Sequence, residues 1–257
     1  MIEPKAEEPS QEPSRVVAAF DFDGTLTHGG SVWQFLVALV GPLPVAVAAS
    51  VLVVKLVRAA LFGGSAADEA KEALFTRTLA GLDIEDVSRR AEAFGLAHYR
   101  RRARPDVNAR LEWHRSQGHL LVIVSASLDL YVSAVGRELK VDEVVATALE
   151  VTPQGILTGR YDGKNCRGSE KLLRVEKWMG TSTASDEPPE GPDAARLGTT
   201  NHRTFLWAYG NSAGDAALLA AADVGVDAGR LGRLGKLRRF TRLADLERKE
   251  GSLGIGS

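Results

Sequence analysis

Two aspartates follow directly on a short apolar segment near the start of the chain. Residues 16–22 read VVAAFDF, a run with the length of a buried strand, and Asp23-Gly24-Thr25 supplies a turn signal after it. In open α/β sheets, ligands bind in the crevice outside the carboxyl ends of the strands. Carboxylates two positions apart on a strand point to the same side, so Asp21 and Asp23 could contact one substrate and form a hard oxygen site for Mg²⁺. The alternative is a strand followed by an ordinary turn with solvated acids, because D-x-D-G is also common in turns and calcium loops.

Three further segments carry polar residues where chemistry could occur. An apolar strand-like run at 120–124, LLVIV, ends at Ser125, and Lys171 lies near the start of the helix expected over SEKLLRVEKW. A third segment, FLWAYGNSAGD, reads as a strand followed by an acidic turn with Asn211 and Asp215. Each residue taken alone is more often structural or solvated than functional. Their order along the chain, after the two aspartates, is what points to a function.

The four segments together resemble the motifs of the haloacid dehalogenase-like (HAD) phosphatase superfamily. The first motif corresponds to DFDGTLT at 21–27, and the other three segments match the second, third and fourth motifs in order. The stretch 105–180, with the WAYGNSAGD segment after it, looks like the branch related to phosphoserine phosphatase, HAD subfamily IB. The resemblance covers about residues 16–227. It implies an α/β fold, a doubly wound parallel sheet with a Rossmann-like core, and an all-helical cap of the C1 type between the first two motifs.

The resemblance also implies a role for each motif residue. Asp21 would be the nucleophile that forms an aspartyl-phosphate, and Asp23 would be the general acid and base. Ser125 would donate a hydrogen bond to a phosphoryl oxygen, and Lys171 would balance negative charge on the phosphoryl group. The substrate would be a phosphomonoester, and Asp23 distinguishes phosphatases from dehalogenases of the same fold. The phosphate-binding residues predicted in this way are Thr25, Ser125, Ala126, Lys171 and Asn211.

The cofactor that the resemblance implies is Mg²⁺. Its predicted ligands are Asp21, Asp23, Asn211 and Asp215, with Asp23 binding through its backbone carbonyl. The most common form of the fourth motif has an Asp where this chain has Asn211. An amide oxygen is still a hard ligand but carries no charge, so we expect somewhat weaker metal binding. Asp215 would bind directly or through water, and it is also a candidate N-cap for the AALLAAA segment, a role compatible with the first.

The composition limits the class of protein. The 257 residues are 44% hydrophobic, enough for one or two domains with a sizeable core. The formal net charge of -1 gives no overall field that would hold nucleic acid, so we expect no nucleic-acid partner. The single cysteine, Cys166, cannot form an internal disulfide or a Cys-rich zinc site, and we expect it to be inert. Because residues 1–15 also lack the pattern of a secretory signal, we expect a cytoplasmic protein, with the inner face of the membrane as the alternative location.

We predict a catalytic core built from two stretches of chain that flank a helical cap. The cap must hold structure of its own, because the chain between the first two motifs is too long for a connecting loop. Within it, 66–82 and 84–102 show the apolar spacing of helices, and Asp83 is a suitable N-cap between them. The predicted divisions are a disordered tail at 1–15, the core at 16–28 and 105–243, the cap at 29–104, a flexible loop within the core at 181–204, and a C-terminal tail at 244–257.

The first part of the cap is unusually apolar. Residues 29–54 contain no formally charged residue, which meets the length rule for a membrane span. Pro42 and Pro44 interrupt this segment and favour two shorter helices, at 32–40 and 45–62. Three alternatives follow: a buried helical pair in a soluble cap, a hairpin that dips into or lies on the bilayer, and a single-pass span.

A peripheral membrane contact would use residues 31–62 together with a basic segment near the C-terminus. Residues 230–242 contain several Arg and Lys residues and no acid, and such a segment is attracted to anionic lipids. The alternative for the basic segment is a solvated terminal stretch. A single-pass span is disfavoured, because it would bring Asp21 to within a few residues of the bilayer.

The substrate is the least determined part of the prediction. Phosphoserine phosphatases usually carry an acidic residue about nine positions after the nucleophile, and this chain has Gly30 there, so strict phosphoserine specificity is not expected. The chain also resembles bacterial phosphatidylglycerophosphatase C in its long apolar segment and its C-x-G-x-E-K third motif, which implies a lipid-phosphate substrate. A small phosphomonoester stays open, as does phosphoserine itself. Two further functions stay open as well: transfer to an acceptor other than water, and a membrane-surface binding protein with a degenerate site, for which Asn211 would be the sign.

Overall fold

The computed structural model describes residues 15–62, 64–183, 204–229, 237 and 239–246. Nearly all of the predicted N-terminal tail, most of the 181–204 loop, most of the basic segment at 230–242 and most of the C-terminal tail lie outside these residues. The first described residue, Arg15, already belongs to a strand.

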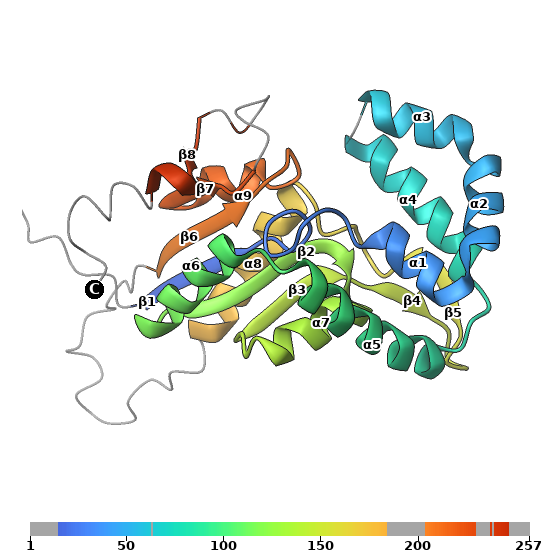
Figure 1. Cartoon of the computed structure of the whole chain (residues 1–257), viewed down its shortest axis with the longest axis horizontal. Helices are drawn as coiled ribbons and strands as arrows, with labels where there is room; N and C mark the ends of the chain where they lie inside the picture. The colour runs from blue at the N-terminus through green and yellow to red at the C-terminus, as the bar shows by residue number, and fades with distance from the viewer. Residues whose placement is uncertain (1–14, 63, 184–203, 230–236, 238, 247–257) are drawn as a thin grey trace, which may run out of the picture.

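A six-stranded parallel sheet forms the centre of the molecule (Figure 1). The strand order is β3-β2-β1-β6-β7-β8, which places the first strand in the middle of the sheet. Phe20 at the end of this strand pairs with Ile123 of β2 on one side and with Tyr209 of β6 on the other, so the residues that follow these three positions lie at nearly the same level. The strands are β1 (Arg15–Phe20), β2 (Leu120–Leu128), β3 (Glu143–Thr147), β6 (Thr204–Gly210), β7 (Val224–Asp227) and β8 (Thr241–Arg242).

Helices cover both faces of the sheet, because alternate residues of the central strands are apolar in both directions. Ala18 and Phe20 of β1 belong to the larger core cluster, which includes Val107 and Leu111 of α6. Val17 and Ala19 point to the opposite face, into a second cluster that contains residues of α8 and α9. The core helices are α6 (Pro105–Ser116), α7 (Asp129–Glu138), α8 (Ser169–Thr183) and α9 (Ala216–Ala221). The prediction of a doubly wound α/β fold is confirmed.

The described residues form five helices between β1 and α6. They are α1 (Val32–Val40), α2 (Pro42–Val51), α3 (Val53–Phe62), α4 (Gly64–Leu79) and α5 (Ile84–Arg102). We call α1–α4 the cap helices; α2, α3 and α4 stand apart from the sheet, whereas α5 packs along α7 of the core (Figure 1). A two-stranded antiparallel sheet, β4 (Leu149–Val151) and β5 (Leu157–Tyr161), contacts α4.

Local signals account for several helix boundaries. The helices predicted at 32–40 and 84–102 are confirmed, and Asp83 caps the latter by accepting hydrogen bonds from the backbone of Glu85 and Asp86, both at 3.0 Å. The single helix predicted at 45–62 is wrong. The structure has two helices there, starting at Pro42 and separated by Leu52. Proline at the first position of a helix loses no hydrogen bond, so Pro42 and Pro44 begin this helix and do not interrupt it.

The cap helices bury only one side of their apolar surface. Phe35, Leu36 and Val45 are at most 1% exposed, but Leu43 and Leu61 are each 72% exposed. A wholly buried helical pair is therefore wrong as a description of this segment. In the described part of the chain, every helix is also too short or too polar to cross a membrane, which contradicts the single-pass alternative.

Candidate active site

The polar residues predicted to act together lie at the carboxyl ends of the three central strands. Asp21 follows β1, and its backbone N–H donates to the carbonyl of Tyr209 in β6 at 2.9 Å. Ser125 lies in the last part of β2, and Asn211 directly follows β6. The parallel register of the strands brings these residues to one edge of the sheet.

The sequence suggested that Asp21 and Asp23 lie on one face of a strand, and the structure shows that they do not. β1 ends at Phe20, and the chain then turns tightly, with Gly24 at φ 81° and the N–H of Leu26 bonded to the carbonyl of Asp21. A side chain at Gly24 would meet Asn211 at 2.0 Å, so this position needs both the left-handed backbone and the absence of a Cβ. Because of the turn, Asp21 and Asp23 contact different groups.

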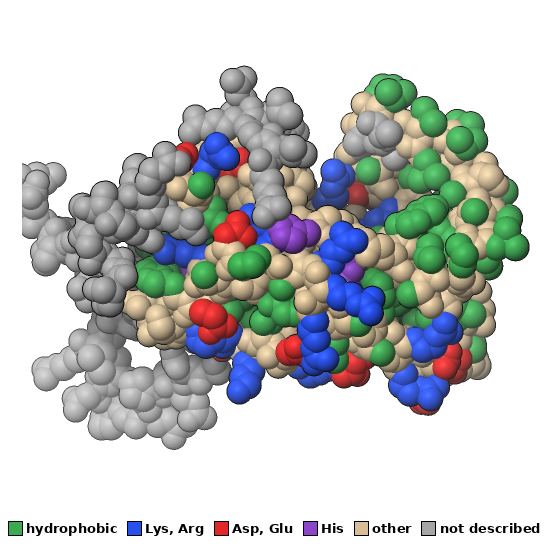
Figure 2. All heavy atoms as spheres, viewed as in Figure 1, with side chains coloured by type: hydrophobic (Ala, Val, Ile, Leu, Met, Phe, Trp, Pro, Cys, Tyr) green, Lys and Arg blue, Asp and Glu red, His purple; other side chains and the backbone are tan. Residues whose placement is uncertain are grey.

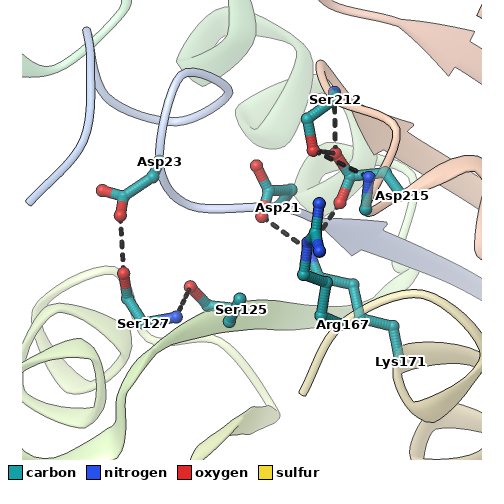
Figure 3. A pocket seen from close by; sticks show the side chains of 10 residues that line it. Asp21, Asp23, Ser125, Ser127, Arg167, Lys171, Ser212 and Asp215 are labelled. Carbon is teal, nitrogen blue, oxygen red and sulfur yellow. Dashed lines mark hydrogen bonds and ion pairs between the residues drawn. The ribbon is translucent and has the colours of Figure 1, made fainter. Parts of the chain in front are cut away.

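A pocket opens between these strand ends (Figure 3). Its walls contain predicted site residues together with others that the motifs did not indicate. The lining residues are Asp21, Asp23, Ser125, Ala126, Ser127, Arg167, Lys171, Ser212, Gly214 and Asp215.

Lys171 holds two carboxylates at the base of the pocket. Its Nζ donates to Oδ1 of Asp21 and to Oδ1 of Asp215, both at 2.6 Å. All three side chains are buried, and Lys171 comes from the first turn of α8, as predicted. An ammonium group buried between two carboxylates is a fixed positive charge in a site of low dielectric.

Burial and the three neighbouring charges shift the pKa values of this cluster apart. Burial and the charge of Asp215 raise the pKa of Asp21 to about 7, against the opposing effect of Lys171. Burial also opposes ionisation of Asp215, but Lys171 and the hydrogen bonds from Ser212 lower its pKa overall. Burial alone would lower the pKa of Lys171, but the two carboxylates raise it. The cluster therefore keeps Lys171 charged and Asp215 ionised, and leaves Asp21 as the carboxyl that is hardest to ionise.

Asp23 lies among hydroxyl groups on the other side of the pocket. Its Oδ2 accepts from Ser31 at 2.9 Å and from Ser127 at 2.5 Å, and Ser31 in turn contacts the hydroxyl of Tyr131 at 2.8 Å. Its Oδ1 is buried and has no hydrogen-bond partner among the described residues. A buried carboxylate oxygen is costly to leave unpaired, so this atom is placed to meet a group that enters the pocket.

Ser125 and Ala126 form the wall contributed by β2. Ser125 is 1% exposed, and its Oγ accepts from the backbone N–H of Ser127 at 3.0 Å. The carbonyl of Ala126 accepts from Lys71 of α4 at 2.5 Å and from Thr147 at 2.9 Å. Lys71 thus connects a cap helix directly to the pocket wall.

Three oxygen atoms lie close together: Oδ2 of Asp21, the carbonyl oxygen of Asp23 and the amide oxygen of Asn211. Oδ1 of Asn211 lies 3.1 Å from the carbonyl oxygen of Asp23 and 3.2 Å from Oδ2 of Asp21. The hydroxyl of Thr25 also donates to Oδ2 of Asp21, at 3.0 Å. With the amide of Asn211 rotated, its nitrogen would donate to both neighbouring oxygens instead. When the amide oxygen of Asn211 faces Asp21 and Asp23, a carboxylate, a carbonyl and an amide oxygen lie within about 3.2 Å of the amide position. This is a donor set that suits Mg²⁺.

In the fourth predicted ligand, Asp215, both carboxylate oxygens already accept hydrogen bonds from other residues of the protein. Its Oδ2 accepts from the backbone N–H of Asn211 at 3.1 Å and from both the N–H and the hydroxyl of Ser212 at 2.9 Å. It stands at the N-cap position of α9 as predicted, but its side chain makes no capping hydrogen bond to that helix. Across the described ranges, no cluster of three or more His, Cys, Asp or Glu side chains is arranged to hold a metal ion. A metal ion at the oxygen site beside Asp21 would therefore need the amide of Asn211 and the backbone carbonyl of Asp23 as ligands, in addition to a carboxylate.

A family model described as haloacid dehalogenase-like hydrolase matches residues 18–220, and thus includes every residue that lines the pocket. The chain belongs to this family. The predicted family membership is confirmed, and with it the prediction that the chain is an enzyme of the hydrolase class.

This HAD-like hydrolase is similar to other proteins over most of its length. Protein CicA from Caulobacter vibrioides (strain NA1000 / CB15N) is 33% identical over 222 residues, which cover 86% of this chain and 88% of the relative. A crystal structure of a protein of unknown function from Bordetella pertussis Tohama I has a TM-score of 0.63 and 21% identity, and the alignment covers 93% and 96% of the two chains. A substrate-bound phosphoserine phosphatase has a TM-score of 0.59 and 17% identity, with 94% and 99% covered. At these identities the two structural likenesses show the fold.

The HAD-like motifs did not reveal every residue of the pocket. Arg167 was missed, although it lines the pocket and lies beside Lys171 and Asp21 in Figure 3. Its place is supported from the cap, through a hydrogen bond from Nη1 to the carbonyl of Gly64 at 3.1 Å. Ser31 was also missed, because its contact with Asp23 depends on how the start of α1 packs against β2 and α7. The nearest sequence signal for Arg167 was its position four residues before Lys171.

Proposed function

We propose that this HAD-like hydrolase is a Mg²⁺-dependent phosphomonoesterase that works through an aspartyl-phosphate on Asp21. The observation that carries the proposal is the pairing of two different carboxyl environments in one pocket. Asp21 is held at 2.6 Å from the charged Lys171, and Asp23 presents a buried oxygen with no partner among the described residues. Carboxyl groups in unlike environments can take unlike roles, one as nucleophile and one as acid and base.

Two displacements at phosphorus make up the proposed reaction. In the first, a carboxylate oxygen of Asp21 forms a bond to phosphorus, the ester P–O bond breaks, and the leaving oxygen takes a proton from Asp23. In the second, Asp23 takes a proton from water as the water oxygen bonds to phosphorus. The Asp21–phosphorus bond then breaks and inorganic phosphate leaves. Asp23 returns to its first protonation state, so the cycle balances.

The remaining pocket residues would position and stabilise the phosphoryl group. Ser125 and the backbone near Ala126 supply hydrogen-bond donors, and Lys171 supplies positive charge. We add Arg167 to the predicted set, because a guanidinium that lines the pocket can donate two hydrogen bonds to a phosphoryl group or to an anionic leaving group. Thr25 would keep Asp21 oriented through its 3.0 Å hydrogen bond.

The residues proposed to hold Mg²⁺ are Asp21, the carbonyl of Asp23, and Asn211. When bound, the ion would supply the positive charge that lets an anionic nucleophile approach an anionic phosphate. Asp215 would act mainly by orienting the Asn211 loop and Lys171, since both of its oxygens already accept hydrogen bonds. A contact between Asp215 and the ion through water stays compatible with this role.

We propose a small or lipid-linked phosphomonoester as the substrate. A structural neighbour is a phosphoserine phosphatase, but Gly30 offers no charge to read an amino acid, and no atom lies within 4 Å of where its Cβ would be. Phosphoserine phosphatase activity proper is the second candidate. For the location, we propose the cytoplasm or its membrane face, since the one cysteine of the chain is a buried free thiol, as suits a reducing compartment.

The proposed function is tested by phosphate release from phosphatidylglycerophosphate in micelles and from soluble phosphoserine, with and without Mg²⁺. The expected result is Mg²⁺-dependent release that Asp21→Asn lowers by about 10³-fold or more, because the nucleophile is removed. The ratio of the two rates assigns the substrate class. Equal release by Asp21→Asn would overturn the proposed mechanism. Consumption of substrate only when an alcohol is added, with the phosphoryl group recovered on the alcohol and not as inorganic phosphate, would make the protein a phosphotransferase. A wild-type chain that binds both compounds without turnover would be a binding protein.

A further inference from the structure

The outward side of helices α2 and α3 is an exposed apolar surface. Six large side chains on it are between 55% and 76% exposed, and they define what we call the outer cap face. In Figure 2, hydrophobic side chains gather over α1, α2 and α3, whereas charged side chains gather along α5 and α7. Contiguous apolar surface of this kind marks a site of interaction with a protein or a membrane. The six residues are Leu43, Val47, Val51, Val54, Leu61 and Phe62.

The two sides of α2 differ in burial but not in polarity. Val45 and Ala48 are 0% and 5% exposed and point toward the other cap helices. The opposite side carries Val47 and Val51, and the hydroxyl of Ser50 donates to the carbonyl of Val47 at 2.8 Å, so it is satisfied within the helix. This side therefore has no charged group and no side-chain hydroxyl that needs water. Contact with a hydrocarbon phase would leave no polar side chain of α2 unsatisfied.

The charged side chains on helices α1 to α3 have one sign. The chain has no Asp or Glu between Asp23 and Asp68, and the charged side chains of α3 are Lys55 and Arg58, both exposed. Around the axis of α3, Arg58 lies between Val54 and Phe62, and Lys55 lies just beyond Phe62. Exposed apolar side chains combined with Lys and Arg and no acidic residue on the same helix are the pattern of a helix that lies in a membrane interface.

We propose that the outer cap face docks on the surface of a lipid bilayer that contains anionic headgroups. The apolar side chains would lie at the headgroup and acyl boundary, and Lys55 and Arg58 would lie at headgroup level. The choice of lipid over protein rests on the exposed side of α2, which has no charged side chain, because a typical transient protein interface is only about as apolar as the rest of a protein surface. The inference stands apart from the proposed hydrolysis, since all the residues that line the pocket lie outside α2 and α3.

Vesicle flotation of the full chain tests this inference. The wild type is expected to float with vesicles of phosphatidylcholine and phosphatidylglycerol. The variant Leu43→Glu/Val54→Glu/Leu61→Glu is expected to lose binding by roughly tenfold or more, because three apolar groups that would enter the interface become anionic. The matched control is Leu173→Glu/Val151→Glu, which changes exposed apolar residues of the core, 58% and 40% exposed, and should leave binding unchanged.

A second comparison separates lipid docking from other occupants. Lys55→Glu/Arg58→Glu is expected to weaken binding to vesicles with phosphatidylglycerol much more than binding to pure phosphatidylcholine, and added salt should imitate this effect. All these variants should hydrolyse a soluble aryl phosphate as fast as the wild type does. This measurement checks that the substitutions leave the catalytic core folded. A wild type that stays with the unbound fraction would overturn the proposal. So would light scattering that shows a dimer which the triple glutamate variant makes monomeric, since the face would then bind a second copy.

Discussion

Asp21 and Asp23 are two positions apart in the chain but lie in different electrostatic surroundings. Asp21 contacts a buried ammonium group, whereas Asp23 accepts hydrogen bonds from two serine hydroxyls. The tight turn at Gly24 produces this separation, because it points the two side chains toward different elements. A pair of carboxyl groups treated so differently suits a reaction that needs one anion and one proton carrier.

Replacing Asp23 by Asn should separate the two steps of the reaction. On an alkyl phosphate, kcat should fall by roughly 10² to 10⁴-fold, the usual contribution of general acid and base catalysis. On an aryl phosphate, whose leaving group needs little protonation, the first step should survive and the second should not. The phosphoenzyme should therefore accumulate in Asp23→Asn, as seen by acid quench and mass spectrometry. Asp162→Asn, at an exposed carboxylate, is the control, and an equal loss in both variants would argue against the assigned role.

The motif residues could be predicted because their order along the chain resembles the HAD motifs. Each also follows a local pattern, either the end of an apolar run or the start of a helix. Ser125 and Lys171, predicted in this way, line the pocket, and the predicted Asn211 has its amide 3.2 Å from Oδ2 of Asp21. Arg167 and Ser31 could not be found, since they reach the site only through contacts with the cap and with β2. The sequence pattern therefore indicates where strands and helices begin and end, but not which side chains from other elements pack beside these ends.

Among the elements, the helix at 84–102 was predictable to the residue. Its cap Asp83 and its apolar spacing are both local, and neither depends on the rest of the molecule. The break at Leu52 was not predictable, because nothing in the apolar sequence around it differs from a continuous helix. The side chain of Leu52 is 5% exposed and belongs to the larger core cluster.

The contact between the β4–β5 hairpin and helix α4 depends on one glycine. Gly159 has φ +75°, and a Cβ there would lie 2.5 Å from Cα of Thr76 and 2.6 Å from the carbonyl oxygen of Phe75. Gly159→Ala should therefore lower the free energy of unfolding by about 1–3 kcal/mol more than backbone strain alone, because backbone atoms cannot move aside cheaply.

Gly163→Ala is the matched control for this prediction. Gly163 has φ +80°, and no atom lies within 4 Å of the position that an alanine methyl group would take, so only backbone strain is expected there. Denaturant unfolding followed by circular dichroism measures both variants. Equal losses of stability would mean that the hairpin does not press on α4.

For the molecule as a whole, the parallel sheet with helices on both faces followed from the family resemblance and is confirmed. The exposure of the cap was not predictable. Whether an apolar helix is buried depends on what covers it, and here α4 covers only one side of α2 and α3. The same apolar sequence could have formed a closed cap, which is why the sequence left three possibilities open.

The stability of the whole fold should depend on pH through His114. This side chain is 0% exposed and contacts the hydroxyl of Tyr209 at 2.8 Å, and burial together with the charge of Arg110 lowers its pKa from 6.5 to about 3. The folded protein keeps His114 neutral while the unfolded chain binds a proton below about pH 6.5. The free energy of unfolding is therefore unaffected by His114 above that pH and falls as the pH drops toward 3.

Denaturant unfolding at several pH values measures this effect. Between pH 7.5 and pH 5, His114 should cost about 2 kcal/mol, at roughly 1.4 kcal/mol per pH unit below the unfolded pKa. His114→Gln keeps a polar partner for Tyr209 but cannot titrate in this range. Between pH 7.5 and pH 5, the free energy of unfolding of this variant should therefore fall by about 2 kcal/mol less than that of the wild type. Identical pH profiles for the two proteins would show that His114 becomes protonated without unfolding.

The proposed chemistry requires Asp21 to carry the phosphoryl group during turnover. The most direct measurement is acid quench of the enzyme during hydrolysis of an aryl phosphate with Mg²⁺, followed by mass spectrometry of its peptides. We predict one added phosphoryl group on the peptide that contains Asp21, present in the wild type and absent in Asp21→Asn. Turnover without any phosphorylated peptide, or with phosphate on a different residue, would contradict this mechanism.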